Sequence, residues 1–119
     1  MEFRESLYAV LKSSSIWEQY TFVLPHDEND APFPTKEFFE SEECDVILAE
    51  VSYPSTGQGI EIGWADTLHI PLVCLYKKNA SISQSLYTVT NKFVEYMDEE
   101  DLVKKITRVL DHIRVEMKL

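Results

Sequence analysis

The sequence has few cysteines, few glycines and few basic residues. The low numbers of cysteines and basic residues each exclude a class of site or partner. Its two cysteines, Cys44 and Cys74, form no metal-binding spacing and no disulfide framework. Eleven basic residues against 21 acidic ones give a net charge of −10, which disfavours binding to the phosphate backbone of duplex nucleic acid. No apolar run is long enough to span a membrane, and no targeting segment is recognisable. A cytoplasmic protein with a reduced, buried Cys74 is therefore expected, with no nucleic-acid or membrane partner.

The order of apolar and amphipathic segments predicts one α/β domain over residues 1–119. Apolar runs typical of buried strands alternate with segments of helical periodicity. Strands are expected at Tyr20–Pro25, Val46–Val51, Ile70–Tyr76 and Asn91–Met97. Helices are expected at 3–11, at 36–43 with Thr35 as the cap, at 59–68 and from 99 onward.

Strands that alternate with helices pair in parallel, with helices on both faces of the sheet. The expected fold is therefore a three-layer, flavodoxin-like or Rossmann-like sandwich with about four parallel strands. Ligands gather at the carboxyl ends of such strands. The loops after Leu24, Val51 and Tyr76 would share that edge.

The stretch PSTGQGIEIGWA, residues 54–65, carries the strongest functional signal. Ser55 offers a hydroxyl, and Gly57 and Gly59 allow a ligand to approach the backbone at a helix start. Glu61 is expected in the first helical turn, where the helix dipole favours its ionised form. An ionised, positioned carboxylate can attack the anomeric carbon of a sugar. A purely structural interpretation stays open, since turn glycines and first-turn glutamates are common.

The same stretch resembles the nucleoside 2-deoxyribosyltransferase family, closest to its 2′-deoxynucleoside 5′-monophosphate N-glycosidase branch. The likeness is carried by Asp45, Ala49, Glu50, Val51, Pro54, Ser55, Gly57, Gly59, Glu61, Gly63 and Ala65. It implies cleavage of the N-glycosidic bond of nucleosides or their monophosphates, or transfer of the sugar to another base. It implies no cofactor, and a homodimer or larger homo-oligomer.

The resemblance also assigns roles to individual residues. Glu61 matches the nucleophile, and Ser55 matches a serine that contacts the sugar or its 5′-phosphate. Ser85 matches a second phosphate-contacting serine that reaches a neighbouring subunit's site, although Ser83 or Ser81 are alternatives. Counting back without gaps puts Glu37 at the position of the second acid, which manages protons on the base; a solvated first-turn acid is the alternative.

Three further residues are weaker candidates. Asp45 lies at a strand end, where it would act in catalysis or position the loop. His26 ends the first predicted strand and would face the ligand edge, although loop histidines are usually solvated. Trp64 would stack against the base or else belong to the core. No metal site is expected, because the acid-rich segment 26–32 lacks the spacing of a calcium loop.

The sequence departs from the family at its beginning, where the family has a central strand that this chain is expected to lack. Three explanations stand open: the strands at Tyr20–Leu24 and Val46–Val51 pair directly, another chain supplies a strand, or the natural start lies upstream of Met1. The leading hypothesis is an enzyme with a covalent glycosyl-Glu61 intermediate. The alternative is a relative that binds a nucleotide or sugar phosphate without turnover.

Overall fold

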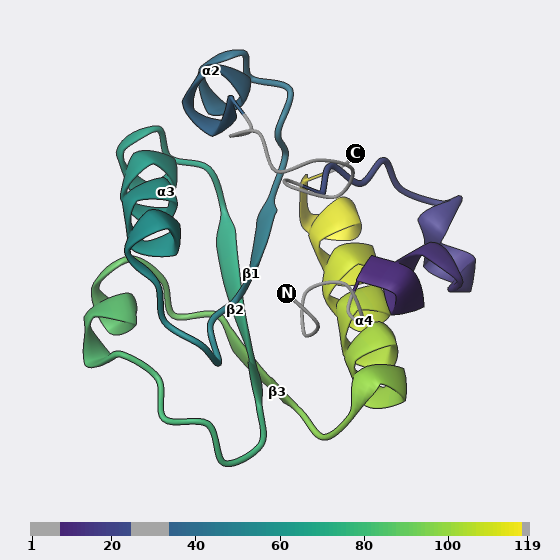
Figure 1. Ribbon diagram of the computed structural model, residues 1–119. Helices are drawn as coiled ribbons and strands as arrows, with labels where there is room; N and C mark the ends of the chain where they lie inside the picture. Colours follow the sequence, from purple (N-terminus) through teal and green to yellow (C-terminus); the bar gives the residue numbers. More distant parts are fainter. Residues whose placement is uncertain (1–7, 25–33, 118–119) are drawn as a thin grey trace. The chain divides into compact units, whose positions relative to one another are not determined.

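A computed structural model describes residues 8–24 and 34–117, and the structural statements below concern those residues (Figure 1). The chain divides into two compact units. We call residues 33–95 the sheet unit, and residues 1–32 together with 96–119 the helical unit.

The sheet unit is built on a three-stranded parallel sheet in the order β1-β2-β3 (Figure 1). Its strands are β1 (Ile47–Glu50), β2 (Leu72–Lys77) and β3 (Phe93–Tyr96), the last of which ends at the boundary between the units. Parallel pairing sets Ile47 opposite Leu72 and Glu50 opposite Leu75. β2 lies between the other two strands, and its first four residues are all buried. This explains why apolar and polar residues do not alternate along this segment of the sequence.

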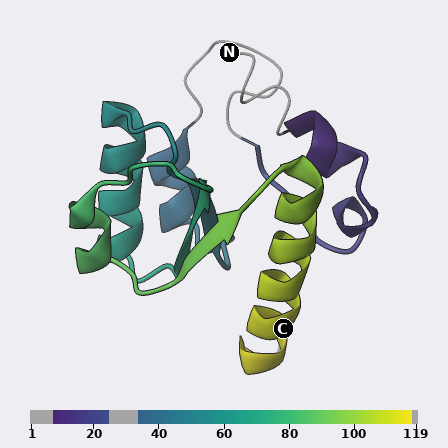
Figure 2. The ribbon, with the colours of Figure 1, turned by 90° about the horizontal axis from the view of Figure 1, so that it is seen from below.

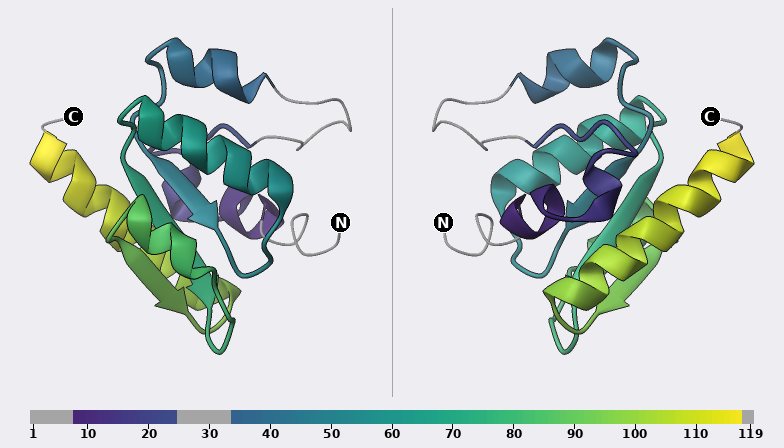
Figure 3. Two further views of the ribbon diagram at one scale, coloured as in Figure 1. Left: turned by 90° about the vertical axis from the view of Figure 1, so that its left-hand side faces the viewer. Right: turned by 90° about the vertical axis from the view of Figure 1, so that its right-hand side faces the viewer.

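Three helical segments accompany the sheet: α2 (Thr35–Glu40), α3 (Thr56–Thr67) and the 3-10 helix η2 (Gln84–Thr88). Figure 2 shows α3 and η2 on the same face of the sheet, and α2 lies beside α3 (Figure 3). The core below them consists of buried apolar side chains, namely Ala49, Val51, Ile62, Leu72 and Cys74. Ile82, Leu86 and Val89, from η2 and its flanks, pack against that core. Burial of this apolar surface holds the helices to the sheet.

The helical unit consists of a helical segment at residues 8–12, the 3-10 helix η1 (Ser15–Trp17) and the long helix α4 (Glu99–Met117). The helix predicted from residue 99 onward is confirmed, and its apolar residues Leu102, Ile106, Leu110 and Ile113 are buried at helical spacing. The Tyr20 hydroxyl donates to Asp111 Oδ1 at 2.6 Å, and the Arg114 guanidinium lies 5.8 Å from the centre of the Tyr20 ring. These contacts connect the N-terminal segment to α4.

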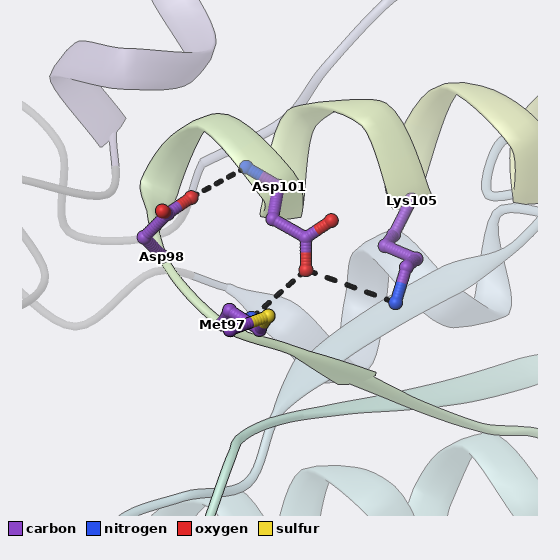
Figure 4. Close-up of polar contacts among 4 residues, drawn as sticks. All are labelled: Met97, Asp98, Asp101 and Lys105. Carbon is purple, nitrogen blue, oxygen red and sulfur yellow. Dashed lines mark hydrogen bonds and ion pairs between the residues drawn. The ribbon is translucent and has the colours of Figure 1, made fainter.

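Two aspartates accept hydrogen bonds from backbone N–H groups at the start of α4 (Figure 4). Asp98 Oδ1 accepts the backbone N–H of Asp101 at 2.8 Å, which occupies a donor that a helix start otherwise leaves unpaired. Asp101 Oδ2 in turn accepts the backbone N–H of Met97 at 2.9 Å and lies 3.7 Å from Lys105 Nζ. These two aspartates therefore serve the start of the helix.

The α/β fold with a parallel sheet is confirmed, and the sheet has three strands where about four were expected. The strand predicted at Tyr20–Pro25 is wrong, because residues 21–24 have no regular secondary structure. Its aromatic residues are used locally instead, with the Phe22 ring stacked on Trp17 at 5.3 Å. Direct pairing of this segment with β1 is therefore not observed in the described residues. An apolar run becomes a strand only where a neighbouring strand can pair with it.

Two predicted helix starts also differ from the structure. Thr35 is the first residue of α2, and Pro34 occupies the cap position that Thr35 was expected to hold. α3 begins at Thr56, three residues before the predicted start, so that all three glycines of the chain lie inside this helix. Helix ends are set by local hydrogen bonds, which periodicity alone does not specify.

Left-handed backbone conformations occur at three residues that are not glycine. Glu42 follows α2 with φ 66°, His69 follows α3 with φ 59°, and Asn79 follows β2 with φ 73°. Asparagine and histidine are enriched in this conformation, whereas glutamate adopts it at a cost. The chain thus ends two helices without the glycine that usually occupies this position.

The two cysteines differ in exposure, and both have raised pKa values. Cys74 is fully buried in β2, and this burial raises the pKa of its thiol to about 11. Burial also raises the pKa of the half-buried Cys44 thiol, although a hydrogen bond with the backbone of Val46 opposes the shift. Since the thiolate is the reactive form, both shifts slow modification at neutral pH. As the pH rises from about 9 to about 11, an unfolded Cys74 ionises while the folded one stays protonated, so stability decreases.

We expect a thiol reagent at pH 8 to modify Cys44 in the folded protein, while Cys74 reacts only when the sheet unit opens. The measurement is the number of labelled cysteines against time, with and without urea. Cys44→Ser should abolish the labelling seen without urea. Rapid labelling of both thiols in the folded wild type would contradict the burial of Cys74.

Candidate functional site

The loop after β1 is held by the side chain of Ser52. Its backbone N–H and its hydroxyl both donate to the Glu50 carboxylate, the hydroxyl to Oε2 at 3.1 Å. The same hydroxyl oxygen accepts the backbone N–H of Lys77 at 2.7 Å. Ser52 therefore connects the carboxyl ends of β1 and β2, and a side chain takes the place of a strand carbonyl where the ladder ends.

Helix α3 follows directly, and Ser55 is its N-cap. Ser55 Oγ accepts the backbone N–H of Gln58 at 3.2 Å, and the Ser55 carbonyl accepts the N–H of Gly59 at 3.1 Å. The Gln58 side chain turns back to β1, where Nε2 donates to the Glu50 carbonyl at 2.6 Å. The exposed first turn of α3 is thereby fixed at the carboxyl edge of the sheet, where parallel α/β sheets bind ligands.

Glu61 lies in the second turn of α3, so its expected place in the first turn is wrong. A rise of 1.5 Å per residue puts it roughly 9 Å along the helix from Ser55. Helical spacing places Gln58, Glu61 and Ala65 on one side of α3, next to the buried Ile62. Glu61 is half-buried, between the exposed Ile60 and the core-facing Ile62. Its side chain therefore emerges at the border between the helix surface and the sheet.

Glu50, the other glutamate of this region, has a structural role. Both oxygens of its carboxylate accept hydrogen bonds from Ser52, and its carbonyl accepts one from Gln58. A carboxylate engaged in this way stabilises its own loop.

The glycines of α3 are surrounded by open space. A Cβ atom added to Gly57, Gly59 or Gly63 would meet nothing within 4 Å, and none of the three has a positive φ. The packing and backbone of the described protein therefore do not require glycine at these positions. Gly57 and Gly59 lie exposed in the first turn, beside the Ser55 cap.

The other predicted site residues fall in different places. Glu37 is exposed in the first turn of α2, which lies beside α3 near the amino end of β1 (Figures 1 and 3). Asp45 is also exposed and precedes β1, at the edge of the sheet opposite to Ser55. Ser85 is exposed in η2, which follows the carboxyl end of β2, and its N–H donates to Ser83 Oγ at 3.3 Å.

Trp64 is half-buried in α3, and His26 lies outside the described residues. The structure thus brings Ser55, Gly57 and Gly59 together on one helix with Glu61. Within residues 8–24 and 34–117, no group of three His, Cys, Asp or Glu side chains is arranged to hold a metal ion. Over the same residues, none of the helices has the length and apolar character needed to cross a membrane.

Several curated proteins are similar to part of this chain. A protein of Methanosarcina barkeri named "Putative 2'-deoxynucleoside 5'-phosphate N-hydrolase 1" is 38% identical over 69 residues, which cover 56% of this chain and 43% of that protein. A protein of the same name from Thermofilum pendens is 34% identical over 74 residues, covering 58% and 52%. The 5-hydroxymethyl-dUMP N-hydrolase of Branchiostoma floridae is 41% identical over 49 residues, covering 41% and 47%.

These similarities, each over part of the chain, support the nucleoside 2-deoxyribosyltransferase-like family. They agree with the family that the stretch around Glu61 indicates. No family profile matches the chain, and no solved structure matches it significantly. The chain spans about half the length of the curated relatives it matches.

Sequence reasoning missed two residues of the candidate site region, Ser52 and Gln58. Ser52 is a nearly buried polar residue, at 9% exposure, directly after a strand. A hydroxyl in that position signals a hydrogen bond that replaces the ladder, because buried polar groups are almost always paired. Gln58 carries no such signal, since a glutamine in the first turn of a helix is ordinary.

Ser52→Ala should lower the free energy of unfolding by about 1–3 kcal/mol, because the Lys77 N–H and the Glu50 carboxylate lose a shared partner in a half-buried place. Urea unfolding followed by circular dichroism measures the change. Ser83→Ala is the matched control, since it removes a longer and exposed hydrogen bond of the same unit. Equal effects of the two substitutions would contradict the role of Ser52.

Proposed function

We propose that this chain carries the nucleotide-binding and nucleophile-bearing part of an enzyme that hydrolyses the N-glycosidic bond of 2′-deoxynucleoside 5′-monophosphates. The observation that carries the proposal is the arrangement on α3, where the Ser55 cap, the open glycine turn and Glu61 follow the carboxyl end of β1. The names of the relatives, which are N-hydrolases of deoxynucleotides, support it.

The first turn of α3 would bind the 5′-phosphate. Backbone N–H groups at a helix start favour anions, which allows a chain of net charge −10 to hold a phosphate locally. Ser55 adds a hydroxyl, and the glycines let phosphate oxygens approach the backbone. Ser85 would supply a further hydroxyl from η2 in a homo-oligomer.

Glu61 would then act as the nucleophile. A nucleotide whose phosphate is bound at the helix start leaves its anomeric carbon within reach of a side chain farther along α3. The Glu61 carboxylate attacks that carbon while the bond to the base nitrogen breaks, and the base leaves with the bonding electron pair. A second acid, for which we propose Glu37, protonates the base. Water then attacks the same carbon, gives a proton to that acid and releases Glu61, with retention of configuration.

Glu61→Gln should lower base release by at least roughly 100-fold, since an amide does not provide the nucleophile. The assay incubates each deoxynucleoside and its 5′-monophosphate with the protein, and chromatography detects the free base in the absence of an acceptor base. Glu43→Gln, an exposed glutamate of the same unit, is the control and should retain the wild-type rate. Nucleotide binding without any base release in the wild type would instead favour the non-catalytic relative.

Gly57→Ala should raise the stability of the protein and weaken its binding of the monophosphate. The added methyl group has open space and suits a helix, so the free energy of unfolding should rise by about 0.5–1 kcal/mol. The same methyl group should weaken monophosphate binding by roughly tenfold, or about 1.4 kcal/mol, because it blocks approach to the first turn. Urea unfolding and titration calorimetry measure the two effects.

Gly63→Ala is the matched control for this substitution. It has the same open space but lies in the next turn, so it should gain stability and keep its affinity. Unchanged affinity in Gly57→Ala would show that the phosphate does not approach the first turn of α3.

A further inference from the structure

The Gln58 side chain joins α3 to strand β1 at a backbone group that the sheet leaves unused. The Val51 N–H donates to the Leu75 carbonyl on β2 at 2.8 Å. Successive residues of a strand direct their peptide groups to opposite edges, so the Glu50 carbonyl faces away from β2. Gln58 Nε2 donates to this carbonyl at 2.6 Å, and both groups are partly buried. The bond is therefore a specific link between helix and sheet.

This link lies on the same side of α3 as Glu61. Gln58 precedes Glu61 by three residues, and Ala65 follows it by four, so the three share one stripe of the helix. Ala65 is fully buried, and its carbonyl accepts the Ile70 N–H at 2.9 Å. That bond closes the C-terminal end of α3, and it is the burial of Ala65 that holds the helix against the core beyond Glu61. Rotation of the helix about its axis would break the Gln58 bond.

The strand end that receives the bond is itself fixed. Ser52 connects the Glu50 carboxylate to the backbone of Lys77 on β2. The position of Glu61 relative to the sheet is consequently set through a chain of hydrogen bonds that runs from β2 through Ser52 and Glu50 to Gln58. A carboxylate that must meet a carbon atom along one direction needs this kind of support, because small misplacements reduce rates strongly.

We propose that Gln58 is a positioning residue for Glu61: its amide fixes the rotation of α3 against β1 and thereby the direction of the nucleophile. The catalytic half of this inference rests on the proposed function. Gln58 acts through the helix and needs no contact with the substrate. Its loss should therefore lower kcat while the phosphate-binding cap at Ser55 keeps KM nearly unchanged.

Gln58→Met tests the inference, because methionine has a similar length and helix propensity but no N–H donor. The matched control is Thr90→Val, which removes a hydroxyl donor to a strand carbonyl, Leu72 O at 2.7 Å, in the same unit and next to the amino end of β2. Gln58→Glu is a second variant with the shape of glutamine and no donor when ionised.

The expected result is a 10- to 100-fold lower kcat in Gln58→Met and Gln58→Glu, with KM within threefold of the wild type. Thr90→Val should keep both constants within twofold. A kcat within threefold of the wild type in both Gln58 variants, or an equal loss in Thr90→Val, would overturn the proposal.

Amide hydrogen exchange tests the structural half without any turnover. The backbone amides of the second turn of α3 should exchange about 5- to 10-fold faster in Gln58→Met than in the wild type, and not in Thr90→Val. Unchanged exchange in α3 would overturn the link between Gln58 and the helix. If the wild type releases no base, the proposed enzyme fails, while this measurement still decides whether Gln58 sets the position of α3.

Discussion

The parallel pairing of β1 with β2 is the interaction on which the sheet unit depends. It brings the loops after both strands to one edge, where Ser52 can donate to Glu50 and accept from Lys77. Helix α3 begins at the same edge, because the chain turns back over the sheet immediately after β1. Loss of this pairing would separate the Ser55 cap from the strand end that supports it.

The strands of the sheet unit were predictable because they are apolar without interruption. Such runs are typical of strands covered on both faces; β1 lies within its expected segment, and β2 extends one residue beyond its own, to Lys77. The stripe of α4 was equally clear, because Leu102, Ile106 and Leu110 recur at helical spacing. Ser55, Gly57 and Glu61 also follow β1 in one turn-and-helix segment as expected, since this requires only a strand, a turn and a helix in sequence; Gly57, expected in the turn, lies inside α3.

Features that depend on a distant partner were not predictable. Residues 21–24 are as apolar as a strand, but whether they form one depends on a neighbour that the local pattern does not reveal. The start of α3 was placed too late, because the glycines suggested a turn and the Ser55 bond to Gln58 begins the helix before them. This shift of three residues moved Glu61 from the first turn to the second, away from the strongest effect of the helix dipole.

The positions of the glycines affect both the stability of the protein and the exposure of its backbone. A protein shaped only for resistance to unfolding would put glycine after α2 and α3, where Glu42 and His69 adopt left-handed conformations, and alanine inside α3. This chain does the reverse on both counts. The glycines at the start of α3 therefore lower the stability of the helix, and they leave the peptide groups of its first turn uncovered by side chains.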